Sequence, residues 1–173
     1  MFIKKVNYLY KFLIIFSLIL PINSSRAEFF KDISNIITIN ENRLSYGVSV
    51  TDINADGNNE FIVTGFGYPN LALGYIDGKL KNIIQEDVFL DRDRKTIGVA
   101  ACDIDKDGFE EIYFLNTDTY SGIKKYSDRL LDKKNNNYFD LFELEKNKEN
   151  LNLTAGRSVA VSYTHLRAHE TAT

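Results

Sequence analysis

The sequence predicts an all-β fold, specifically a partial β-propeller of about two four-stranded blades. The first observation behind this prediction is an internal repeat in which Asp103 follows Asp52 at an offset of 51 residues. The second is that short runs rich in β-branched and aromatic residues flank both positions, as strands require. A period near 50 residues with several strands per copy is typical of propeller blades.

The two copies match in detail. Residues 47–61 read GVSVTDINADGNNEF and residues 98–112 read GVAACDIDKDGFEEI. Each is an apolar strand, then D-I-[ND]-x-D-G-x-x-E, then a second apolar strand. We place the copies near 45–95 and 96–150, with the first strand of a third copy at 155–160. A closed propeller has about 4–8 blades, so we expect the natural protein to be longer than this chain.

Other segments predict the connections. Asp77-Gly78 suits a two-residue type I′ turn between strands. Residues 132–137 are polar and rich in Asn, and predict a loop. The charged runs at 91–94 and at Lys124-Lys125 predict solvated surface.

The chain begins with the pattern of a secretory signal peptide, which we assign to residues 1–27. Residues 12–20 are apolar apart from one serine, and Ser25 and Ala27 form a small-x-small cleavage site. An uncleaved membrane anchor is the alternative, but the apolar run is shorter than the ~20 residues that cross a bilayer. Three lysines form the basic region before the run, at positions 4, 5 and 11.

The last 13 residues resemble translated adapter DNA rather than natural protein sequence. Residues 161–171 read VSYTHLRAHET, which resembles the translation of a common transposase sequencing adapter. We therefore exclude 161–173 from the fold, and assign the repeat region to 28–160. Both histidines of the chain, His165 and His169, fall in this tail, so their spacing is no evidence of a metal site.

Deletion of residues 161–173 should leave the melting temperature unchanged, because an adapter-derived tail has no reason to pack on the fold. Thermal unfolding of the chain with and without the tail measures this. A loss of several degrees would contradict the assignment.

The charge balance disfavours nucleic acid as a partner. The whole chain has a net charge of −3, with 21 basic and 24 acidic residues. The first 27 residues hold four of the basic residues and no acid, and the last 13 hold one of each, which leaves −7 for residues 28–160. An acidic surface repels phosphate backbones and attracts cations.

The repeated acidic loops have the composition of calcium sites. Oxygen-bearing side chains stand at positions 1, 3 and 5, and a glycine at position 6 permits the sharp turn that continues the wrap. Position 9 is an acid in both loops. An EF-hand would need Glu at position 12, where this chain has Val63 and Phe114, so that motif is excluded. The residues at positions 1, 3, 5 and 9 are Asp52, Asn54, Asp56 and Glu60 in the first loop, and Asp103, Asp105, Asp107 and Glu111 in the second.

On these residues the chain resembles the FG-GAP/VCBS repeats of integrin α-subunit propellers and of the cartilage-acidic-protein-like secreted family. The resemblance covers roughly residues 45–160. It implies two Ca²⁺ sites, each with side-chain ligands at positions 1, 3, 5 and 9 and a backbone carbonyl at position 7, which is Asn58 or Phe109. The chain departs from the family by having Glu rather than Asp at position 9, and the Phe-Gly and Gly-Ala-Pro elements are only loosely echoed at 65–69.

The plain alternative is that Asp, Asn and Gly only form turns between strands. Two copies with matched flanks favour Ca²⁺.

Two classes of function remain open. The first is an exported Ca²⁺-binding module, secreted, periplasmic or on the cell surface, that binds an extracellular protein or carbohydrate and has no membrane segment after signal cleavage. The second is a supporting part of a larger extracellular enzyme, such as a polysaccharide lyase. Residues 28–160 contain no His and no G-x-S-x-G, so we expect no enzyme and no catalytic residue in this region. A third reading is that calcium is purely structural.

Overall fold

The computed structural model describes residues 30–119, 122–135 and 137–160. The predicted signal peptide and the adapter-like tail lie outside these residues. The chain divides into two compact units, Met1–Asp32 and Ile33–Thr173, and the sheets belong to the second. No helix within the described part of the chain is both long enough and apolar enough to cross a bilayer.

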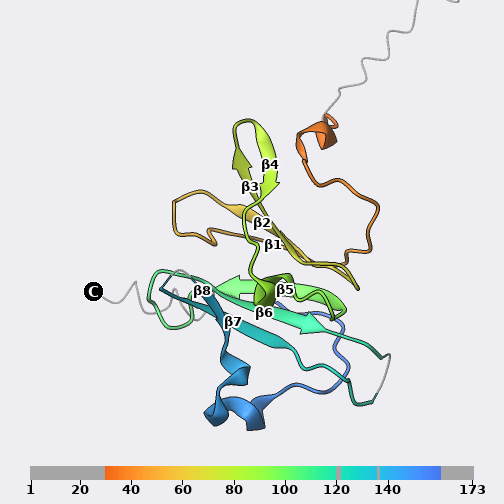
Figure 1. Cartoon of the computed structure of the whole chain (residues 1–173), viewed down its shortest axis with the longest axis vertical. Helices are drawn as coiled ribbons and strands as arrows, with labels where there is room; N and C mark the ends of the chain where they lie inside the picture. Colours follow the sequence, from red (N-terminus) through yellow and green to blue (C-terminus); the bar gives the residue numbers. More distant parts are fainter. Residues whose placement is uncertain (1–29, 120–121, 136, 161–173) are drawn as a thin grey trace, which may run out of the picture. The chain divides into compact units, whose positions relative to one another are not determined.

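The fold is all-β, as predicted, and contains two four-stranded antiparallel sheets whose strands follow one another in chain order (Figure 1). The first sheet contains β1 (Val48–Thr51), β2 (Glu60–Val63), β3 (Leu71–Ile76) and β4 (Lys79–Asn82). The second contains β5 (Thr96–Cys102), β6 (Glu111–Asn116), β7 (Arg129–Lys134) and β8 (Asn137–Asp140). Two such meanders form a partial propeller of two blades.

Short helical segments occupy the connections. They are η1 (Ser34–Ile36), α2 (Asp87–Leu90), η2 (Leu141–Glu143) and η3 (Glu145–Asn150). Residue Asp77 at φ 53° and residue Gly78 at φ 76° form the predicted two-residue turn between β3 and β4. The polar loop predicted at 132–137 is shorter than expected, because Asp132 to Lys134 continue β7 by pairing with β8.

The core lies between the two sheets and is centred on Phe89 of α2. Its ring is fully buried, meets Phe114 edge to face with centroids 5.3 Å apart, and lies 5.6 Å from the ring of Tyr138. Ile53 and Ile62 complete the contribution of the first blade. Helix α2 therefore holds the blades together as well as connecting them.

The innermost strands of the two blades approach closely. A Cβ atom on Gly47 would lie 2.9 Å from the Cα atom of Gly98, which is the equivalent position in the second copy. Gly98 in turn would meet Val159 at 3.2 Å. Residues 155–160 form no strand, and Val159 packs beside Gly98 of β5.

One face of the first sheet is apolar and exposed. Val48, Val50 and Phe61 are 63%, 56% and 41% exposed. Their repeat equivalents in the second sheet are Val99, Ala101 and Ile112, which are buried in the core. The exposed face therefore has the composition of a face that packs between blades.

Two residues of the charged runs, Lys124 and Asp91, depart from the sequence prediction of solvated surface. Lys124 is buried and forms an ion pair with Asp128, which is fully buried, at 2.5 Å. Asp91 is also buried and binds both Arg94 and Arg129. These charges were expected in solvent, but ion pairs with neighbours in the sequence, and for Asp91 also with the distant Arg129, hold them inside the fold.

Phe89→Ala should destabilise the chain by about 3–5 kcal/mol, because the lost ring leaves a cavity that the sheets cannot close. Phe61→Ala removes the same group from the exposed face and should cost less than about 1 kcal/mol. Urea unfolding of both variants measures the difference. Equal losses would show that the core does not centre on α2.

Candidate metal sites

Each acidic loop joins two paired strands at the same end of its sheet. Thr51 pairs with Glu60 in the first sheet, and Cys102 pairs with Glu111 in the second. The eight residues between each pair must turn tightly. Ala55 and Lys106 at position 4, and Gly57 and Gly108 at position 6, all take positive φ angles between 60° and 92°.

The first loop wraps around Asp52. The backbone N–H groups of Asp56 and Gly57 donate to the two oxygens of Asp52, at 3.0 and 2.8 Å. Asn54 accepts from the N–H of Asp56 at 2.9 Å and donates to the Asp56 carboxylate at 3.0 Å. The N–H of Asn58 donates to Asp56 at 2.8 Å and lowers the pKa of that carboxyl. Hydrogen bonds therefore join positions 1, 3 and 5 of this loop.

The second loop repeats this turn with fewer internal bonds. Gly108 N–H donates to Asp103 Oδ2 at 3.2 Å, and Asp107 N–H donates to Asp105 at 3.0 Å. Phe109 N–H donates to Asp107 at 2.9 Å. Asp103 Oδ1 is buried and has no hydrogen-bond partner. Unlike Asp52, Asp103 therefore keeps one oxygen uncommitted.

A buried glutamate at position 9 closes each loop. Glu60 and Glu111 are each 3% exposed. Glu60 accepts from the N–H of Ile53 at 3.1 Å, and Glu111 accepts from the N–H of Ile104 at 2.5 Å. Burial raises the pKa of both carboxyls. In the second loop the other oxygen, Glu111 Oε1, is buried and has no hydrogen-bond partner.

Three acids of the second loop form one group. One carboxylate oxygen from each of Asp103, Asp105 and Glu111 lies within 4.8 Å of the others. The described residues contain no second group of three acids of this kind, because position 3 of the first loop is Asn54. Asp107 lies outside the group. Unpaired buried carboxylates are costly, and a hard cation with oxygen ligands is the chemistry that satisfies them.

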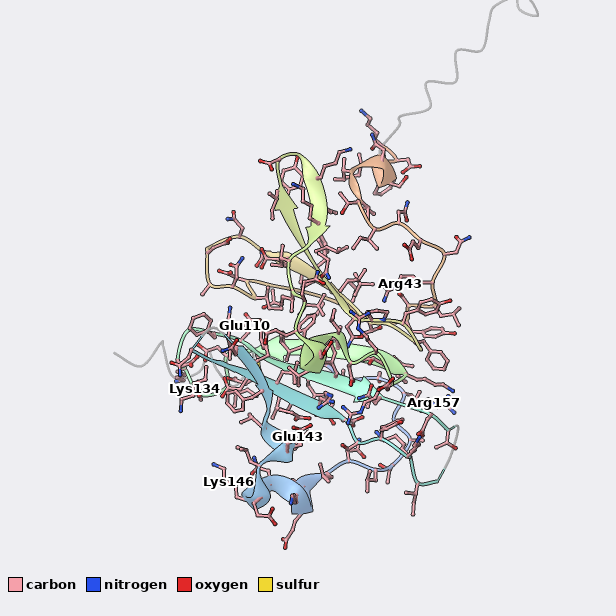
Figure 2. The ribbon with its side chains drawn as sticks, viewed as in Figure 1. Arg43, Glu110, Lys134, Glu143, Lys146 and Arg157 are labelled. Atoms are coloured by element: carbon pink, nitrogen blue, oxygen red, sulfur yellow. The ribbon has the colours of Figure 1, made fainter. Side chains whose placement is uncertain are left out.

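The two loops share contacts across the blades. Tyr138 Oη of β8 donates to the Ile53 carbonyl of the first loop at 2.9 Å, and Thr51 donates to Glu110 of the second loop. Figure 2 shows Glu110 and Lys134 at one end of the second sheet and Arg157 at the other. The hairpin between β7 and β8 therefore reaches the acidic end, a contact that the sequence pattern did not indicate.

The matched repeats and their loops agree with a comparison to known families. Residues 52–114, from the first loop to the strand after the second, match the profile of the FG-GAP-like repeat. This chain contains FG-GAP-like repeats. The chain is also similar to two curated relatives. It is 47% identical over 132 residues to cartilage acidic protein 1 of Xenopus tropicalis, and 42% identical over 160 residues to cartilage acidic protein 1 of Homo sapiens.

These alignments cover 70% and 82% of the chain, respectively. They cover only 20% and 24% of the two relatives, so the chain spans less than a quarter of the length of either relative.

Proposed function

We propose that this chain is an exported Ca²⁺-binding propeller module that binds an extracellular protein or carbohydrate, in which two calcium ions stabilise the blades. The ligands are the side chains of Asp52, Asn54, Asp56 and Glu60 with the Asn58 carbonyl, and of Asp103, Asp105, Asp107 and Glu111 with the Phe109 carbonyl. The signal-peptide pattern and the likeness to cartilage acidic protein 1 support the extracellular part of this proposal.

The observation that carries the calcium assignment is the pair of unpartnered buried oxygens in the second loop, Asp103 Oδ1 and Glu111 Oε1. The residues that carry them lie in one acidic group with Asp105. Ca²⁺ accepts six to eight oxygen ligands in flexible geometry, at about 2.3–2.6 Å, so it suits a loop of mixed carboxylate, amide and carbonyl oxygens. Mg²⁺ demands a tighter octahedral shell and suits it less.

Calcium acts here as a folding ligand rather than a catalytic ion. Every proposed side-chain ligand lies in a short loop or at the start of the following strand, and Glu60 and Glu111 already bind the backbone of their own loop. No histidine lies in residues 28–160 to act as a base beside the ion. We therefore propose no enzymatic activity for this region.

Removal of calcium should lower the melting temperature of the chain by more than about 10 °C. A metal that binds only the folded state adds about 2.7 kcal/mol per site at a hundredfold excess over Kd, so two sites add about 5 kcal/mol. Thermal unfolding in chelator, in millimolar Ca²⁺ and in millimolar Mg²⁺ measures this, and Mg²⁺ should restore little of the loss. Identical curves in chelator and in Ca²⁺ would show that the loops are ordinary turns.

The second loop should bind Ca²⁺ more tightly than the first, because it offers four carboxylates and the first offers three. Asp103→Ala should remove the tighter step of a calorimetric titration, and Asp52→Ala the weaker one. Asp77→Asn, which removes an exposed carboxylate from the turn between β3 and β4, is the matched control and should change neither. If Asp103→Ala keeps the tighter step, ligand charge does not set the order.

A further inference from the structure

A carboxylate outside the predicted loops stands beside the second one. Asp132 of β7 follows Leu131, which pairs with Ile112 of β6. This register brings Asp132 opposite Glu111, the residue before Ile112. Directly opposed residues of antiparallel strands place their side chains on the same face of the sheet, about 4.5–5.5 Å apart at Cβ. Asp132 therefore lies next to the glutamate that closes the second loop.

The equivalent of Asp132 in the first sheet shows which residue a side chain at this position contacts. Phe61 pairs with Leu73, so Gly74 occupies in the first blade the place that Asp132 occupies in the second. A Cβ atom on Gly74 would lie 3.5 Å from Cγ of Glu60. A side chain at this position thus contacts the position 9 glutamate, and only the second blade has a carboxylate there.

Electrostatic coupling agrees with the register. Burial raises the pKa of Asp132, and the negative charges of Asp105 and Asp107 raise it further. Burial likewise raises the pKa of Glu111, with further contributions from Asp105 and Asp132. Glu111 is 3% exposed and its Oε1 has no hydrogen-bond partner. By the strand register, Asp132 therefore lies opposite a buried acid that keeps one oxygen without a hydrogen-bond partner.

Two lysines follow Asp132 in β7. The charge of Lys134 lowers the pKa of Asp132, and Lys133 contacts two aromatic rings. The amino group of Lys133 lies 5.2 Å from the ring centre of Phe109 and 5.5 Å from that of Tyr138. Asp132 accepts the backbone N–H of Lys133 at 2.5 Å. Neither contact removes the negative charge of Asp132, which is available to a cation in the loop.

We propose that Asp132 is a fifth carboxylate beside the second calcium site, outside the group of Asp103, Asp105 and Glu111, and that its charge raises the affinity of that site for Ca²⁺. The first site has no counterpart, because Gly74 stands in its place. This proposal rests on calcium binding by the second loop. A unit charge about 6 Å from a divalent ion in a water-like dielectric changes affinity by about tenfold.

The test is a calorimetric Ca²⁺ titration of the chain in an Asp52→Ala, Asp56→Ala background, where only the second loop binds. Asp132→Asn should weaken binding by about tenfold, and Asp132→Glu should stay within about threefold of the background. Asp77→Asn is the matched control and should leave binding unchanged, because the Asp77 side chain is 85% exposed in the turn of the other blade. The loss caused by Asp132→Asn should shrink as salt is raised.

A second measurement separates charge from structure. In chelator, Asp132→Asn should raise the melting temperature, because it relieves repulsion among the acids, whereas with saturating Ca²⁺ the gain should vanish. A melting temperature lowered equally in both conditions would make Asp132 a structural residue and overturn the proposal. So would calcium binding within twofold of the background. A background that binds no Ca²⁺ would overturn the calcium assignment of the second loop as well.

Discussion

A buried carboxylate at position 9 of each acidic loop is the constraint on which the rest of this structure depends. Glu60 and Glu111 open the second strand of their sheets, yet each is 3% exposed. A buried charge is costly unless it is paired and hydrogen-bonded. One oxygen of each glutamate binds a backbone N–H within its loop, which fixes the turn. In the second loop the other oxygen, Glu111 Oε1, has no hydrogen-bond partner among the described residues. The chain itself therefore satisfies only one of the two buried oxygens of Glu111.

The same constraint links the first loop to packing between the blades. The N–H of Ile53 binds Glu60, its carbonyl accepts from Tyr138 of the second blade, and its side chain is 2% exposed in the core. One residue therefore joins the loop, the buried carboxylate and the neighbouring sheet. A loop that loses its turn would also withdraw Ile53 from the core, so order in the loop and contact between the blades depend on each other.

Local patterns in the sequence were sufficient to predict most of the strands, the turn at Asp77-Gly78 and the tight turns of both acidic loops, because each depends on neighbours within ten residues. The burial and pairing of charged side chains were not predictable from the sequence pattern. The sequence predicts Lys124 as a surface charge, whereas in the structure its amino group donates to Asp128 and to the carbonyl of Asn116. The sequence predicts Asp132 in a loop, whereas in the structure it pairs with β8 and so belongs to β7. The register of β7 with β6 then places it opposite Glu111.

The repeat also explains which apolar groups remain exposed. Ile53 and Ile104 occupy the same position in the two loops, but Ile104 is 57% exposed and Ile53 is 2% exposed. The difference arises because Ile53 packs against the following blade, and no described segment packs on Ile104 in the same way. The face of the first sheet that carries Val48 and Val50 is the equivalent of the face by which the second sheet contacts the first. The described chain thus presents, at its two flanks, both halves of the interface that it also contains between its blades. Burial of apolar area is the main force that drives such contacts, so each flank is suited to receive another blade of the same kind.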